Sequence, residues 1–312
     1  MAKVNPNDKV RVKGMGFLHD RNTDDEFNGR VITETGMMTA EQVVAVGEAA
    51  KKFGNGNAAF TSRMCVEIQG IPFDNIEPLQ EFLDKYGLYT GGTGDRVRPV
   101  VACKGKTCVF GLIPSVDVAK EIHDRFYTGY RNVELPHKFK IAVGGCPNNC
   151  VKPDLNDIGI IGQRKPAVSV EKCKSCKKCI VESGCLMNAA RKNSYDKIEI
   201  NREVCNLCGK CIKNCPFKCI DEEINGVKIV IGGRWGREGK KGKYLSGIYT
   251  LSDAMDIIEK IILVYKDNAF KKERFADMID RLGCEAVEKA VLDSDSLDRK
   301  DEIINKEIPK KN

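Results

Sequence analysis

The chain of 312 residues has few of the residues that usually bind catalytic metal ions or dinucleotides. Only three histidines occur, and no H-E-x-x-H motif, which argues against a histidine-rich metal site. No G-x-G-x-x-G motif follows a predicted strand, so the sequence gives no sign of a dinucleotide site. The absence of any apolar run of about 18 residues predicts no membrane span, and the N-terminus has no apolar signal-peptide core. We therefore expect a cytoplasmic protein.

Cysteine is the residue type in excess, with 15 in the chain. Because no export signal is predicted and most cysteines fall in closely spaced groups, reduced thiols that bind metal are a better interpretation than disulfides. The run CNLCGKCIKNCP has the spacing C-x2-C-x2-C-x3-C followed by proline, which is the bacterial ferredoxin pattern. The earlier run CKSCKKCIVESGC repeats the triplet, but its fourth cysteine comes after five residues and without proline.

These eight cysteines predict two [4Fe-4S] clusters. In two-cluster ferredoxins the fourth cysteine of each run binds the other cluster. The rule defines set A as Cys173, Cys176, Cys179 and Cys215, and set B as Cys205, Cys208, Cys211 and Cys185. Two structural zinc sites are the alternative, although zinc does not require triplets that are each followed by a fourth cysteine. Lone Cys219 is interpreted as a packed thiol, and Cys65 and Cys284 are also left over.

A third group of four cysteines lies upstream of these runs. Set C comprises Cys103 and Cys108, spaced C-x4-C, and Cys146 and Cys150, spaced C-x3-C. Four thiolates in two pairs suit a third [4Fe-4S] cluster. Chance spacing is the alternative for the second pair taken alone.

The segments around set C resemble the sirohaem and [4Fe-4S] sulfite and nitrite reductases. The resemblance rests on LPHKFKIAVGGCPNNC, FTSRMCVEIQGI, GGRWGR and ERFADMIDRLG, and it covers nearly the whole chain. Larger members of the family have C-x5-C in the first pair, so this chain is one residue shorter there. The resemblance implies that Cys150 also bridges to the iron of a sirohaem, so that one sulfur couples cluster and haem.

The resemblance also implies a sulfite site made of basic residues. The segment KFKIAV alternates, so Lys138 and Lys140 share one face of a predicted strand, and the family's lysines in this motif bind substrate. A solvated strand face is the alternative. Arg63 matches the family's substrate-binding arginine, and we expect it on a strand with Cys65 and Glu67 on the same face.

Three further arginines have expected roles in binding anions. Arg30 resembles a second active-site arginine, with a structural ion pair as the alternative. Arg234 and Arg237, in a glycine-rich loop, are expected to bind sirohaem carboxylates. The formal charge of +7 would then be offset by clusters that add about −6 and by sirohaem carboxylates, so we expect no nucleic-acid partner.

The expected fold class is α+β. Residues 1–96 would form the family's ferredoxin-like half domain, residues 97–165 and 224–312 the sirohaem and [4Fe-4S] domain, and residues 166–223 an inserted two-cluster ferredoxin domain. Periodicity and capping signals predict helices over residues 39–54, 75–87, 115–126, 253–266 and 269–282. The charged tail from Lys300 is expected to fray.

The expected activity is the six-electron reduction of sulfite to sulfide. Electrons would enter through the ferredoxin insert from sister subunits, one flavin-bearing and NADH-dependent and one containing iron–sulfur clusters, as the resemblance implies. A sirohaem nitrite reductase is one alternative. A non-catalytic carrier with three [4Fe-4S] clusters is another, although a carrier has no need of an anion site.

Overall fold

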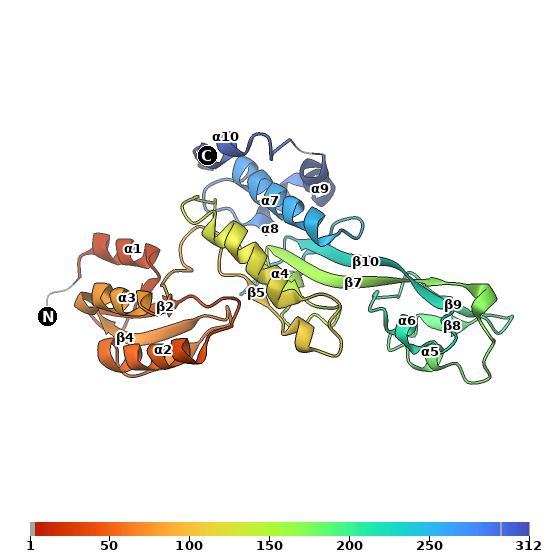
Figure 1. The fold of residues 1–312 in the computed structure, drawn as a ribbon. Coiled ribbons are helices and arrows are strands. Elements are labelled where there is room, and N and C mark those ends of the chain that lie inside the picture. Colours follow the sequence, from red (N-terminus) through yellow and green to blue (C-terminus); the bar gives the residue numbers. More distant parts are fainter. Residues whose placement is uncertain (1–3, 294, 312) are drawn as a thin grey trace. The chain divides into compact units, whose positions relative to one another are not determined.

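The computed structural model describes residues 4–293 and 295–311 (Figure 1). The chain divides into two compact units. The first unit comprises the chain up to Ala102, Ala119–Ala142, and the chain from Glu259. The second comprises Cys103–Val118 and Val143–Ile258. Among the described residues, no helix is long and apolar enough to cross a membrane. The fold is mixed α+β, as predicted.

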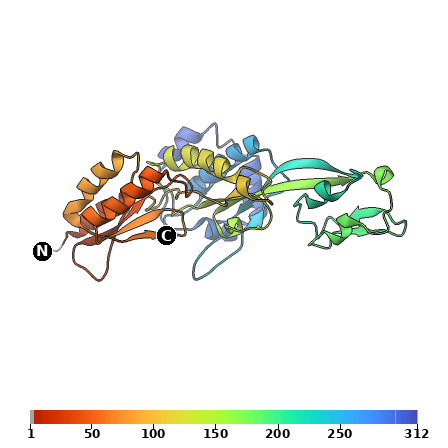
Figure 2. The same ribbon diagram turned by 60° about the horizontal axis from the view of Figure 1, so that its bottom comes forward.

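The N-terminal part of the first unit is a four-stranded antiparallel sheet with the order β1-β2-β4-β3. Helices α2 and α3 pack over its apolar face, where Phe17, Phe27 and Ile68 are fully buried (Figure 2). The elements are α1 (Pro6–Gly14), β1 (Phe17–His19), β2 (Glu26–Val31), α2 (Ala40–Phe53), β3 (Ala58–Phe60), β4 (Val66–Pro72) and α3 (Ile76–Asp84).

Helix α2 begins and ends where the sequence predicts. The hydroxyl of Thr39 accepts a hydrogen bond from the Gln42 N–H, and the Gln42 side chain accepts one from the Thr39 N–H, which forms a capping box. Gly54 follows the last turn as the C-cap residue. Both signals are local, which explains why the sequence alone sufficed.

The rest of the first unit surrounds the segment that carries Lys138 and Lys140. Phe139 is fully buried, and its ring stacks on Tyr265 with the ring centroids 5.3 Å apart. Its N–H donates to the Arg96 carbonyl and its carbonyl accepts from the Arg98 N–H. The regular strand β6 (Ile141–Gly144) begins only after the lysines, so the predicted strand over 138–143 starts late.

The C-terminal helices depart from two sequence predictions. The helix predicted over 269–282 is shorter, because Lys272 adopts a left-handed φ of 72° and α8 spans Phe275–Leu282. The tail from Lys300 forms α10 (Lys300–Asn305), where Ile303 is buried, so the expected fraying is wrong. The remaining elements are β5 (Val101–Ala102), α4 (Ser115–Ile122) with a π-helical turn over His123–Thr128, α7 (Leu251–Asn268) and α9 (Cys284–Leu292).

The second unit is built on a long antiparallel hairpin. Strands β7 (Ile158–Val168) and β10 (Ile220–Ile231) pair along their whole length, and β11 (Lys243–Tyr244) extends the sheet beside β10. The register shifts by one residue at Glu223, because Glu222 pairs with Pro166 and Ile224 pairs with Lys165. Pro166 has no N–H to donate to the ladder.

The segment between these two strands, residues 169–219, contains sets A and B. It folds at the far end of the hairpin into two short helices and a two-stranded sheet (Figure 1). These elements are α5 (Ile180–Ser183), β8 (Ala190–Lys192), β9 (Ile198–Ile200) and α6 (Lys210–Asn214). The flanking strands end at Val168 and begin at Ile220, and the inserted domain over residues 166–223 stays a prediction.

Candidate functional site

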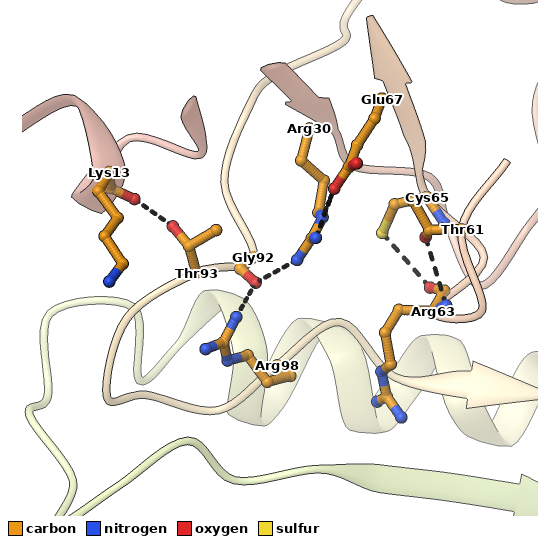
Figure 3. A network of polar contacts seen from close by, with 9 residues as sticks. All are labelled: Lys13, Arg30, Thr61, Arg63, Cys65, Glu67, Gly92, Thr93 and Arg98. Atoms are coloured by element: carbon orange, nitrogen blue, oxygen red, sulfur yellow. Dashed lines mark hydrogen bonds and ion pairs between the residues drawn. The ribbon is translucent and has the colours of Figure 1, made fainter. Parts of the chain in front are cut away.

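A network of arginines connects β2, β4 and the segment after α3 in the first unit (Figure 3). Arg30 lies opposite Glu67 in the ladder, and its Nε donates to the Glu67 carboxylate at 2.9 Å. The carbonyl of Gly92 accepts from Arg30 at 3.1 Å and also from Arg98. Arg30 therefore has the ion pair that was the structural alternative, and its role toward sulfite stays a prediction.

Arg63 lies in a tight turn before β4, so the expected strand face of Arg63, Cys65 and Glu67 is wrong. Met64 has a left-handed φ of 56°, and the Thr61 N–H donates to the Cys65 carbonyl at 2.8 Å. The turn directs the Arg63 guanidinium to the carbonyls of Pro99 and Ile141, the latter at 3.1 Å. The Arg63 guanidinium is thus held at the carbonyl of Ile141, the residue that follows Lys140.

Lys138 and Lys140 are both half-buried and flank the buried Phe139. In an extended segment alternate side chains point to opposite sides, so both lysines lie on the side away from the Phe139 ring. The structure therefore brings Lys138, Lys140 and Arg63 to one short stretch of backbone. Their role as sulfite ligands stays a prediction.

Sequence reasoning missed Arg98, which lies two residues after Arg96 in the same segment. Burial lowers the pKa of Arg98 to about 10, and the neighbouring charge of Arg30 acts in the same direction. Two half-buried arginines side by side concentrate positive charge in this part of the unit. The signal was present in the sequence RVRPV, but a short basic run is usually only a solvated surface.

Set C lies in the second unit, where two chain segments turn side by side. Cys103 follows β5 and Cys146 follows β6, and the Cys103 N–H donates to the Val143 carbonyl at 3.1 Å. The Gly145 N–H donates to the Cys103 sulfur at 3.1 Å. A Cβ on Gly145 would lie 3.3 Å from that sulfur and 3.1 Å from the Gly105 Cα, so glycine permits this close approach.

The four thiols of set C lie near enough to influence one another. Burial raises the pKa of Cys146, and the thiols of Cys103, Cys150 and Cys108 raise it further. Four neighbouring cysteines are suited to binding iron as thiolates, with loss of their protons. Cys150 is exposed, and its second bond to a sirohaem iron stays a prediction. The donor chemistry of set C fits a [4Fe-4S] cluster.

Sets A and B each line their own cavity in the second unit. The four cysteines of set A line a cavity of about 50 Å³, and those of set B line one of about 280 Å³. Cys173 of set A accepts hydrogen bonds from the Ile198 and Ser175 N–H groups, which outweigh burial and lower its pKa. Burial raises the pKa of Cys211 in set B to about 11, with Cys205 and Cys208 adding to the effect.

All fifteen cysteines are free thiols in the structure. Within residues 4–293 and 295–311, no three cysteine, histidine or acidic side chains converge tightly enough to hold a single metal ion. A [4Fe-4S] cluster makes a different demand, because each thiolate binds a different iron around a larger body. The grouping of sets A and B around cavities fits such a body, and the ligand assignment stays a prediction.

The glycine-rich loop with Arg234 and Arg237 projects from the end of β10. Backbone hydrogen bonds in both directions between Arg234 and Lys240 close the loop at its base. Arg234 makes an ion pair with Glu238 at 3.2 Å, whereas Arg237 is exposed. Their role in binding sirohaem carboxylates stays a prediction.

Comparison with known proteins identifies the class. Residues 93–299 match the nitrite and sulphite reductase 4Fe-4S domain, and residues 19–86 match the nitrite/sulfite reductase ferredoxin-like half domain. The chain belongs to the nitrite and sulfite reductase family, and the family resemblance seen in the sequence is confirmed.

Several relatives are similar over most of this chain. An uncharacterized protein of Methanocaldococcus jannaschii is 34% identical over 84% of this chain and 89% of that protein. The coenzyme F420-dependent sulfite reductase of the same organism is 34% identical over 80% of this chain, which spans only 39% of that longer protein. The dissimilatory-type sulfite reductase subunit beta of Archaeoglobus fulgidus is 26% identical over 76% of this chain and 71% of that subunit.

Solved structures show the same fold. Dissimilatory sulfite reductase I superposes with a TM-score of 0.70 at 20% identity, covering 86% of this chain and 69% of that chain. The NirA protein of Mycobacterium tuberculosis superposes with a TM-score of 0.63 at 16% identity, covering 93% of this chain and 48% of that chain.

Proposed function

We propose that this chain is a sirohaem-dependent enzyme that reduces sulfite to sulfide with six electrons. The observation that carries the proposal is set C, four clustered thiols around Gly145 in a chain of the nitrite and sulfite reductase family. Within that family, the chain resembles the sirohaem-bearing chain of the anaerobic sulfite reductases. The relatives named as sulfite reductases support this choice of substrate.

Residues of the second unit would hold the cofactors. Cys103, Cys108, Cys146 and Cys150 would bind one [4Fe-4S] cluster, and Cys150 would also bind the sirohaem iron. Arg234 and Arg237 would bind carboxylates of the sirohaem. When bound, the coupled cluster and haem supply the electrons and the iron to which the sulfur of sulfite binds.

Four basic residues would act on the sulfite oxygens. Lys138, Lys140 and Arg63 would donate hydrogen bonds to them, and Arg30 would add positive charge from its place beside Glu67. A preorganised positive site favours the steps in which negative charge grows on oxygen, because it need not reorganise during the reaction. The lysine ammonium groups would also lie close enough to pass protons to the departing oxygens.

Electrons would enter through the segment between β7 and β10. Sets A and B would make it a two-cluster ferredoxin domain, which brings the total to three [4Fe-4S] clusters. The donors would be separate sister subunits, one flavin-bearing and NADH-dependent and one with iron–sulfur clusters. Support comes from the cavities, each of which is lined by one predicted set.

Anaerobic purification followed by measurement of iron, labile sulfide and sirohaem tests the proposal. We expect about twelve cluster irons and one sirohaem per chain, together with sulfide production from sulfite by an artificial low-potential donor. Stoichiometric zinc would contradict the cluster assignment. Clusters without sirohaem would identify an electron carrier instead, and turnover of nitrite but not sulfite would identify a nitrite reductase.

A further inference from the structure

The cavity of set A is lined by a fifth cysteine. Cys219 is 2% exposed and lies beside the four predicted ligands. Its sulfur is 3.3 Å from that of Cys215, and it lines the same cavity as Cys173. One of the four predicted ligands is therefore in direct contact with a thiol that the ferredoxin spacing leaves unused.

The backbone after α6 explains why both sulfurs reach the same cavity. The Lys218 N–H donates to the Cys215 carbonyl at 3.1 Å, which closes a turn around Pro216 and Phe217. Lys218 has a left-handed φ of 50° and reverses the chain. This reversal places the Cys219 side chain in the same cavity as the Cys215 side chain.

The two cysteines are held by different parts of the unit. Cys215 is the C-cap residue of the short helix α6. Cys219 immediately precedes β10, and its carbonyl accepts from the Ser169 N–H at 2.8 Å. The next residue, Ile220, pairs with Val168 at the end of the hairpin. Cys219 is thus fixed to the sheet, independently of the α6 turn.

Set B has no such neighbour within its own segment. Its cavity is lined by Cys185, Cys205, Cys208 and Cys211, and the one other thiol there, Cys146, belongs to set C. Cys185 is the equivalent of Cys215, because each is the fourth cysteine of its run. This difference supplies a matched control.

We propose that Cys219 is an alternative ligand of the set A cluster and can take the place of Cys215. The inference rests on the proposed function insofar as set A binds a cluster. In the exchange, one iron–sulfur bond to Cys215 breaks and one to Cys219 forms. The thiol proton of Cys219 passes to the Cys215 sulfur, and no oxidation state changes.

Iron and labile sulfide counts on anaerobically purified full-length variants test this inference. Alanine is the replacement, because serine could itself bind iron through its oxygen. We expect Cys215→Ala and Cys219→Ala each to keep the wild-type iron content of about twelve cluster irons. The double variant should lose about four, and so should Cys185→Ala. The electron paramagnetic resonance spectrum of reduced Cys215→Ala should show one altered cluster signal, because its ligand geometry differs.

Two results would overturn the inference. One is a Cys215→Ala protein that loses as much iron as the double variant. The other is a Cys215→Ala protein that is insoluble while Cys219→Ala is soluble, because a cluster retained by Cys219 should preserve the fold. A wild-type protein with only about four cluster irons would instead contradict the proposed function at sets A and B.

Discussion

The arginine network of the first unit and the cysteine sites of the second solve opposite electrostatic problems. Around Arg30 the protein supplies the countercharge, because Glu67 lies directly across the ladder and the Gly92 carbonyl accepts one further hydrogen bond. Around Cys146 the neighbours are thiols, which raise its pKa further. The first site contains its own countercharge, whereas the thiolates of the second would be neutralised by bound iron in the proposed function. The two units should therefore respond differently to loss of metal and to loss of single charges.

Removal of iron should give the largest difference between the two units. With a strong chelator under anaerobic conditions, amide hydrogen exchange in residues 169–219 should accelerate by about a hundredfold or more, because cluster binding contributes directly to folding of this segment. Exchange in the sheet β1-β2-β4-β3 should stay within a few-fold of its starting rate. Mass spectrometry of peptic fragments measures both regions in one sample. Equal acceleration in both would contradict the comparison.

Lys140→Ala tests whether the first unit acts on substrate. Loss of one preorganised donor should lower sulfite turnover by about 10²–10³ while the sirohaem spectrum and iron content stay unchanged. Lys140→Arg should restore little of the turnover, because a planar guanidinium does not replace a compact ammonium group. The assay is sulfide production with an artificial low-potential donor, so that the proposed electron entry through residues 169–219 is bypassed. A fully active Lys140→Ala enzyme would show that this lysine is not a substrate ligand.

Glu67→Gln tests the internal countercharge of the arginine network. Both partners of the Arg30–Glu67 pair are largely buried, so removal of the carboxylate should lower the free energy of unfolding by about 1–3 kcal/mol. Denaturant unfolding of the holoenzyme, followed by the loss of the β1–β4 sheet, measures the change. The conservative Glu67→Asp should restore part of it. An unchanged free energy of unfolding would show that the Arg30–Glu67 ion pair does not stabilise the fold.

A smaller, pH-dependent effect is expected at Glu259 in the same unit. Burial alone would raise its pKa, but hydrogen bonds from Lys300, Tyr130 and Arg125 outweigh burial and lower the pKa below its usual value of 4.5. Because the folded pKa is lowered, the stabilisation is fully present above pH 4.5 and is lost as the pH falls through the folded value. Glu259→Gln should lower the free energy of unfolding at pH 7 and flatten the acid side of the stability profile. A profile that keeps its acid slope would contradict this assignment.

Local chemistry decided what the sequence could predict. The capping box at Thr39 depends on neighbours within a few residues, and the structure confirms it. The cysteine spacings are equally local within each run, and the cavities lined by sets A and B are consistent with the predicted sets, which stay a prediction. Arg63 was misplaced because a left-handed Met64 converts an apparent strand into a turn. The tail helix was missed because its stability depends on burial of Ile303, which is a long-range effect.

The same distinction separates Cys215 from Cys219. The spacing rule identifies Cys215 by its distance along the chain from Cys211. The contact of Cys219 with Cys215 depends instead on the reversal at Lys218 and on the pairing of the next residue with Val168. The spacing of cysteines along the chain gives no information on the pairing of Ile220 with Val168. From the sequence alone, Cys219 is therefore interpreted as a packed thiol.

The hairpin that carries residues 169–219 also bears on how such a chain could arise. Val168 and Ile220 are partners in one rung of the ladder, so the segment leaves and rejoins the sheet at the same point. A shorter ancestor could therefore have closed β7 and β10 with a simple turn and acquired the segment in a single genetic insertion, with every other rung unchanged. The same arrangement makes the segment exchangeable in the laboratory, since a replacement needs only two ends about one strand spacing apart.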